Sequence, residues 1–174
     1  MNSQLVAFNT LLFKEIKRIV RIWPQTLLPP VITMTLYFVI FGQMIGSRIG
    51  EMGGVSYMQF IVPGLIMMSV ITNSYSNVVS SFFSTKFHGS IDEMLVSPIS
   101  KHAILLGYVG GGVFRGLAIA LIVSIVALFF TQLTISHFPI MLITIIGTSV
   151  LFSLGGFVNA VFAHSFDDIS IVPS

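Results

Sequence analysis

The sequence contains no cysteine and very little charge. Among its 174 residues only 8% are Lys, Arg, Asp or Glu, whereas an ordinary soluble domain has about 25%. The lack of cysteine excludes a disulfide-stapled secreted module, and the lack of charge excludes a water-soluble globule of this size. Disorder is excluded as well, because 55% of the residues are apolar. The formal net charge of +2 does not indicate a nucleic-acid partner. With a mean hydropathy of +0.98, this is an integral membrane protein.

Long runs without charged residues predict where the chain crosses the membrane. A helix that crosses about 30 Å of hydrocarbon needs about 20 mostly apolar residues. The charge-free runs are 22–47, 52–85 and 116–166, and a polar break at 131–139 divides the last one. We therefore predict one all-α membrane domain over residues 1–174, with four membrane-spanning helices at about 24–45, 57–82, 104–130 and 139–163.

The prolines predict where the first span begins, and the lysines and arginines predict how the chain is oriented in the membrane. The residue before a proline avoids the helical conformation, so Leu28 is expected to be extended and the first span to begin near Pro29. Membrane proteins keep lysine and arginine on the cytoplasmic side. A cytoplasmic amino terminus leaves Arg48 alone outside and places six cations inside: Lys14, Lys17, Arg18, Arg21, Lys86 and Lys101.

The segment 4–21 has the pattern of an amphipathic helix. Its apolar residues recur at three- and four-residue steps and are Leu5, Phe8, Leu12, Ile16, Ile19 and Trp23. The opposite face carries Asn9, Thr10, Lys14, Lys17, Arg18 and Arg21. Two interpretations are open: an elbow helix that lies in the membrane interface, or a basic flank that only sets the topology.

The loop between the second and third spans predicts a short helix at about 91–97. Ser90 and Glu93 have the spacing of a capping box at its start, and Pro98 ends it. Because so short a helix is marginal alone, it must pack against something. Its apolar side chains, Ile91, Met94 and Leu95, could pack against the protein's own span ends or against a cytoplasmic partner.

No nucleotide, metal or nucleophile motif occurs in the sequence. The Walker A pattern is absent, so no ATP site is expected on this chain. The histidines are scattered without a metal-binding spacing. Ser149 and His164 are 15 residues apart, about 22 Å on a continuous helix, which argues against an intramembrane hydrolase. The glycine pairs 107/111, 112/116 and 42/46 are typical of close helix packing instead.

Arg115 has two possible depths. If the third helix begins at Ala103, the guanidinium lies about 18 Å along it. A charge at such a depth costs about 3 kcal/mol and implies a functional partner or pathway. If the hydrocarbon segment begins at Gly116 instead, Arg115 lies at the cytoplasmic interface.

Four segments in order resemble the ABC-2 type permeases of bacterial inner membranes. They are 29–37 (PPVITMTLY), 57–65 (YMQFIVPGL), 91–98 (IDEMLVSP) and 166–169 (FDDI). The resemblance implies a permease subunit of an export-type ABC transporter that lies in the inner membrane and dimerises. Its motor is a separate ATPase subunit that binds ATP and Mg²⁺, so no cofactor and no catalytic site are expected here. Residues 4–21 would form the elbow helix. The coupling helix would contact the ATPase through Ile91, Asp92, Glu93, Met94, Leu95 and Pro98.

The family also has a fifth and a sixth span, whereas this sequence stops at Ser174. We therefore expect the chain to be truncated after its fourth span. Residues 165–168 are expected to form a helix cap at the start of the fifth span. A coupling role is the alternative for Asp167 and Asp168, which, like Arg115, are possible functional charges. The alternative function is a truncated or vestigial membrane scaffold that binds partners but moves no substrate.

Overall fold

The computed structural model describes residues 3–52, 54–132 and 137–170. Almost all of them are helical, which confirms the predicted fold class. The elements in chain order are α1 (Ser3–Arg21), α2 (Trp23–Tyr37), the π-helix η1 (Phe38–Ile45), α3 (Gly46–Ile49), β1 (Glu51–Met52), β2 (Val55–Ser56), α4 (Tyr57–Phe87), α5 (Ser90–Val96), α6 (Lys101–Leu128), α7 (Phe138–Phe162) and α8 (Phe166–Ser170). The antiparallel strands β1 and β2 form a small hairpin.

Four stretches of this structure are long and apolar enough to cross a membrane. They are Trp23–Gly42, which runs from α2 into η1, and the helices α4, α6 and α7. These stretches overlap the four predicted spans. The polar break between the third and fourth spans contains residues 133–136, which lie outside the described residues.

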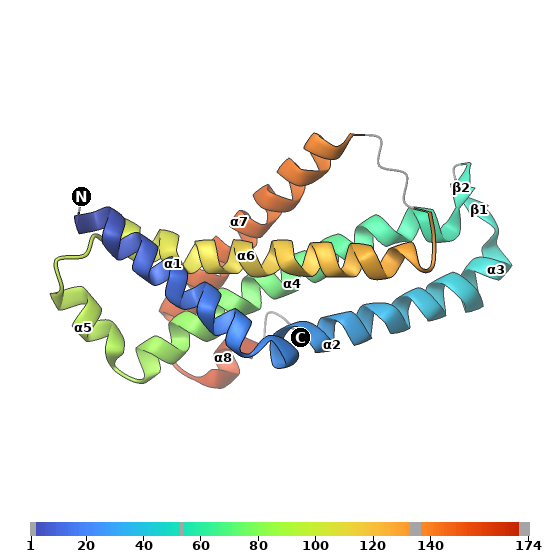
Figure 1. The fold of residues 1–174 in the computed structure, drawn as a ribbon. Coiled ribbons are helices and arrows are strands. Elements are labelled where there is room, and N and C mark those ends of the chain that lie inside the picture. Colours follow the sequence, from blue (N-terminus) through green and yellow to red (C-terminus); the bar gives the residue numbers. More distant parts are fainter. Residues whose placement is uncertain (1–2, 53, 133–136, 171–174) are drawn as a thin grey trace.

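The long helices run side by side between two ends of the molecule (Figure 1). The amino terminus and α5 lie at one end, called here the α5 end, and α3 with the β1–β2 hairpin lies at the other, the hairpin end. Helix α6 packs against α1, α2, α4 and α7. Helix α7 crosses the bundle obliquely, and its first half diverges from the other helices (Figure 1).

The first span does not begin at Pro29, and Leu28 is not extended. Helix α2 starts at Trp23 and continues through Pro29 and Pro30. A proline inside a helix leaves the carbonyl four residues earlier without its partner. For Pro30 that carbonyl belongs to Thr26, and the Arg115 Nη2 donates a hydrogen bond to it at 3.2 Å. This contact from a distant part of the sequence removes part of the penalty that the prolines impose on α2.

The interior consists of two apolar clusters with a polar layer between them. The cluster near the hairpin end includes Phe38, Val62, Val70, Ile119 and Val123. The cluster near the α5 end includes Leu11, Val78, Phe82, Tyr108 and Ala160. Between these clusters, α4, α6 and α7 contribute several buried polar side chains and glycines. We define the polar layer as Glu15, Arg18, Thr26, Asn73, Ser74, Asn77, Ser81, Arg115, Ser149 and Ser153.

Glycines on α6 allow its neighbours to approach closely, as the glycine pairs predicted. A Cβ at Gly111 would lie 2.7 Å from the Glu15 Cβ on α1. A Cβ at Gly116 would lie 2.7 Å from the Ser149 Oγ on α7. Such distances are not possible between real side chains, so larger residues at these positions would separate the helices.

Candidate functional site

Helix α5 occupies the predicted position, but its start differs from the predicted capping box. Ser90 is the first helical residue, and the residue before it is Gly89, whose φ of 72° is in the left-handed region. Gly89 also follows His88, the residue that caps the carboxyl end of α4, and a left-handed glycine at this position commonly ends a helix. Because Gly89 makes this sharp turn, α5 begins at once and Ser90 does not serve as its cap. The carboxyl end is as predicted, since Ser97 is extended before Pro98.

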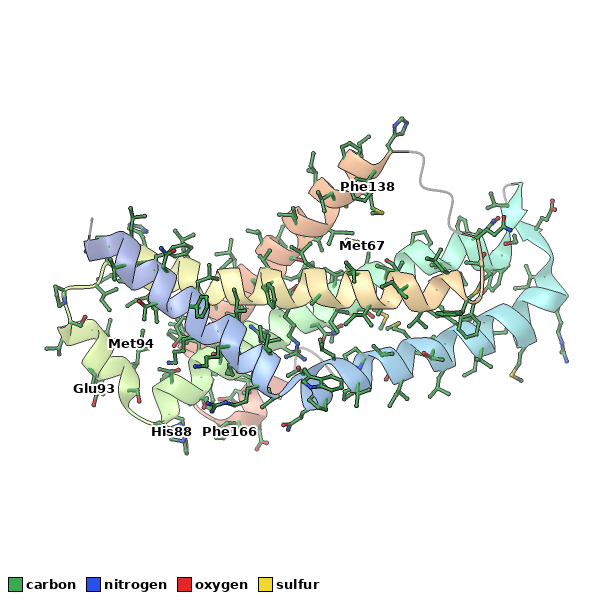
Figure 2. The ribbon with its side chains drawn as sticks, viewed as in Figure 1. Met67, His88, Glu93, Met94, Phe138 and Phe166 are labelled. Carbon is green, nitrogen blue, oxygen red and sulfur yellow. The ribbon has the colours of Figure 1, made fainter. Side chains whose placement is uncertain are left out.

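Helix α5 has a packed side and an uncovered side. Ile91 and Met94 pack against the cluster near the α5 end. Leu95 and Val96 are 58% and 90% exposed. Asp92 and Glu93 are exposed in the first turn, where the helix dipole favours negative charge. Figure 2 shows Glu93 on the outer side of α5, whereas Met94 turns toward the bundle. The helix is therefore held by its own protein on one side and leaves an acidic, apolar surface free on the other.

Helix α1 packs along α6 through a narrower stripe than the sequence predicted. Its buried residues are Leu11, Glu15 and Ile19, four residues apart. The two ends of the predicted stripe, Leu5 and Trp23, are 57% and 54% exposed. The basic residues Lys14, Lys17 and Arg21 are exposed, as predicted for the outer face.

Arg18 does not belong to that outer face. Its Nη2 donates to the Glu15 Oε2 at 2.8 Å and to the Asn77 Oδ1 at 3.0 Å. Glu15 is only 2% exposed, and the Ser81 Oγ donates to its other carboxylate oxygen at 2.7 Å. A buried carboxylate is strongly unfavourable unless it is paired and hydrogen-bonded, and here it is both. Glu15 and Arg18 thus connect α1 to α4.

Glu15 is not among the predicted site residues, although the sequence contains a signal for it. On α4, Ser69, Asn73, Asn77 and Ser81 recur at four-residue steps, which places them on one helix face. A polar stripe within a charge-free span indicates that polar groups from another helix face it. Glu15 and Arg18 on α1 and Arg115 on α6 are those groups.

Arg115 lies within the bundle, level with the start of the first span. Its Nη2 donates to the Thr26 carbonyl oxygen at 3.2 Å and to the Asn73 Oδ1 at 3.0 Å. Thr26 comes three residues after the start of α2, whereas Arg115 comes 14 residues after the start of α6. By helix rise, α6 therefore extends about 16 Å farther toward α5 than α2 does. This position favours the interface depth for Arg115 over a charge at the bilayer centre.

Ser165 and Asp168, near the carboxyl end, form the predicted cap. The Asp168 N–H donates to the Ser165 Oγ at 3.2 Å, and the Asp168 Oδ2 accepts from the backbone N–H groups of His164 and Ser165, both at 2.9 Å. These bonds stabilise the carboxylate, so the pKa of Asp168 lies below its ordinary value. Asp167 is exposed in the same first turn of α8.

The side chains that could perform chemistry are far from one another or buried. Ser149 is fully buried between helices, and His164 is exposed beyond the end of α7. Within the described ranges, no group of three or more His, Cys, Asp or Glu side chains could hold a metal ion. The described residues therefore offer a helix-end surface and a buried polar layer as candidate functional features.

Comparisons with known proteins agree with this architecture. The family model described as "ABC-2 type transporter" matches residues 6–174. The chain is 58% identical over 174 residues to "Inner membrane transport permease YadH" of Escherichia coli (strain K12) and to the protein of the same name from Shigella flexneri. In both cases the match covers 100% of this chain and 68% of the relative.

A more distant relative is "Nodulation protein J" of Neorhizobium galegae, 25% identical over 152 residues, which are 84% of this chain and 56% of that protein. No solved structure matches the chain. The match along nearly the whole sequence does not favour the scaffold alternative. The chain belongs to the ABC-2 type transporter family and is a permease subunit of an ABC transporter in the inner membrane.

Proposed function

We propose that α5 is the coupling helix through which an ABC ATPase subunit drives this permease. The observation that carries the proposal is the uncovered side of α5, with the highly exposed Val96 next to Asp92 and Glu93. This surface combines apolar area with negative charge at the end of the bundle. The fact that the chain is an ABC transporter permease supports an ATPase as its partner. ATP and Mg²⁺ would bind to that partner.

The distribution of charge supports a cytoplasmic location for α5 and for the amino terminus. Most of the lysines and arginines lie toward the α5 end, including Lys14, Lys17, Lys86 and Lys101, whereas Arg48 lies at the hairpin end. Positive charge is retained on the cytoplasmic side of membrane proteins. Because α6 extends about 16 Å beyond the start of the first span, α5 would stand clear of the hydrocarbon, within reach of a soluble ATPase.

The connections of α5 suggest how a movement of the ATPase would reach the membrane. Helix α5 joins the end of α4 to the start of α6, so displacement of α5 acts on both helices. The Glu15–Arg18 pair binds α1 to α4 through Ser81 and Asn77. Helices α1, α4 and α6 would therefore move together, with α1 as the elbow helix. A second permease subunit, implied by the resemblance to dimeric ABC-2 permeases, would complete the path for the exported substrate.

Co-purification with the ATPase tests this proposal. The permease is expressed with an ABC ATPase of its own organism, and the bound ATPase is quantified after the permease is purified. Val96→Asp and the double variant Asp92→Lys/Glu93→Lys are expected to abolish the association, because both change the exposed side of α5. Val55→Asp, at the exposed hairpin on the opposite end, is the matched control and should retain the ATPase. Unchanged association in the α5 variants would remove the coupling-helix assignment.

A further inference from the structure

Helix α7 is hydrogen-bonded to α4 at its carboxyl end. The Lys86 Nζ, in the last turn of α4, donates to the carbonyl oxygens of Val161 and Ala163 at 2.7 and 2.8 Å. The last carbonyls of a helix have no partner within it, and a cation there also meets the negative end of the helix dipole. The Asn159 Nδ2 donates to the Tyr75 hydroxyl of α4 at 2.6 Å. Among the described residues, no other hydrogen bond joins α7 to another helix.

The middle of α7 packs closely on α6 without a polar bond. A Cβ at Gly116 would lie 2.7 Å from the Ser149 Oγ, and a Cβ at Gly112 would overlap the Ser153 Oγ. Both serines are fully buried, and neither hydroxyl has a hydrogen-bond partner in the part of the chain that the structure describes. At this level α7 is therefore held by the close packing of small groups rather than by hydrogen bonds.

The amino half of α7 stands away from the other helices. Phe138, Ile140 and Ile143 are exposed, and the first buried residue of the helix is Ile145. Figure 1 shows this half diverging from α6, and Figure 2 shows Phe138 apart from the bundle. Helix α7 thus has a free amino half, a close contact near Ser149, and a carboxyl end that is bound to α4.

The carboxyl end of α7 is bound where α4 leads into α5. Lys86 lies four residues before Ser90, the first residue of α5. The same turn of α4 also contacts α8, because Phe166 packs on Phe83 and Phe87 with ring centroids 4.9 and 5.0 Å apart. The end of α4 is therefore fixed to the segment around the end of α7, and a displacement of α5 that moves the end of α4 acts on α7 as well.

We propose that α7 is a lever that α4 drives, with Lys86 as the positioning residue that makes the carboxyl end of α7 follow the end of α4. Displacement of that end tilts α7 about its contact near Ser149, and the free amino half swings the opposite way. By helix rise, the driven arm from Ser149 to Val161 is about 18 Å long and the free arm from Ser149 to Ile140 about 14 Å. Ile140 therefore moves about three quarters as far as Val161. This proposal rests on the coupling function proposed for α5 and extends it to α7.

Distances between two spin labels on the permease in lipid nanodiscs test the proposal. The chain has no cysteine, so labels at Ile140→Cys and Leu121→Cys, both at exposed positions, report the distance from the amino half of α7 to α6. In the permease alone, Lys86→Met keeps the length of the side chain but has no donor, and it should broaden the distance distribution. Lys86→Met/Asn159→Leu, which removes every hydrogen bond described above, should broaden it further. Lys86→Arg can donate to the same carbonyls and should retain the wild-type distribution.

The same label pair is then measured in the complex with the ATPase, before and after ATP and vanadate are added. The mean distance should shift in the wild type and in Lys86→Arg. In Lys86→Met the shift should be lost while the ATPase remains bound and hydrolyses ATP, a result that a merely structural role of Lys86 would not give. Lys101→Met is the matched control, because it removes an exposed lysine at the start of α6 that donates no hydrogen bond to α7, and it should behave as the wild type.

Two results would overturn the lever. One is an unchanged distance distribution in the permease alone when Lys86→Met/Asn159→Leu is compared with the wild type. The other is a shift with ATP and vanadate that persists in that double variant or is absent from a wild-type complex that hydrolyses ATP. Binding of the ATPase tests the coupling proposal, whereas the distances in the permease alone test the lever, so the two proposals can fail separately.

Discussion

Replacing Glu15 by alanine is expected to destabilise the protein by about 3 kcal/mol. Removal of one partner of a buried ion pair typically costs about 3–5 kcal/mol, because the other charge remains unpaired. We expect the lower end of this range, because the side chain of Arg18 is 32% exposed and water can hydrate part of it. Ser81 would also lose the carboxylate oxygen that accepts its hydrogen bond.

Two related variants distinguish the effect of the Glu15 charge on stability from the effect of its hydrogen bond and packing. Glu15→Gln keeps an oxygen that can accept from Ser81 but loses the ionic partner of Arg18, so a loss of about 1–2 kcal/mol is expected. Glu15→Met/Arg18→Met removes both charges and keeps apolar volume. Replacing a whole buried pair in this way is often close to neutral, so the double variant should be more stable than Glu15→Ala alone.

Unfolding by sodium dodecyl sulfate, followed by the fluorescence of Trp23, measures these changes. This residue is the one tryptophan of the chain, and it lies at the start of α2. Glu51→Ala is the control, because it removes an exposed carboxylate at the hairpin. The reasoning would be refuted if Glu15→Ala cost less than about 1 kcal/mol. Simple additivity of the Glu15→Met and Arg18→Met effects would refute it as well, because paired residues must show coupling.

Three further predictions concern helix packing, Arg115 and the cap of α8. Gly116→Ala would place a Cβ 2.7 Å from the Ser149 Oγ and should cost about 1–3 kcal/mol in the same unfolding assay; Gly147→Ala, which meets open space, should be neutral or slightly stabilising. Arg115→Lys should cost about 1–2 kcal/mol, because one ammonium does not reproduce the bridge to the first span and α4; an unchanged midpoint would contradict this. The pKa of Asp168 is lower in the folded chain than its ordinary value of 3.8. The cap therefore stabilises the start of α8 fully at pH values above 3.8, and this stabilisation is lost as the pH falls through the lower pKa of the folded chain. Hydrogen exchange of the two capped amides should therefore lose its protection over that acidic range in the wild-type chain, whereas Asp168→Asn should show no such transition.

The spans could be predicted from the sequence because their cause is local. A charge-free run of sufficient length must satisfy its own backbone groups in lipid, and a helix does so within the segment. Bounds such as those of α6 and α7 therefore follow from composition and length. The cap of α8 is also local, since Ser165 and Asp168 are three residues apart.

The features that the sequence did not reveal depend on distant partners or on competing local signals. Pro29 and Pro30 remain inside α2 while Arg115, far along the chain, binds a carbonyl that Pro30 leaves free. Gly89 ends α4, and this removed the cap expected at Ser90. Arg18 lies partly inside the bundle because it pairs with Glu15 and donates to Asn77 on α4. Helical periodicity alone assigned it to the face of exposed cations.

Cysteine cross-linking from α5 tests the coupling proposal most directly. The chain has no cysteine of its own, so single cysteines at Val96 and Val55 can be compared without background. In membranes that contain the assembled transporter, a short cross-linker at Val96→Cys is expected to capture the ATPase subunit, whereas Val55→Cys at the opposite end should capture none. Capture from Val55→Cys, or no capture from Val96→Cys in a complex that still hydrolyses ATP, would contradict the account.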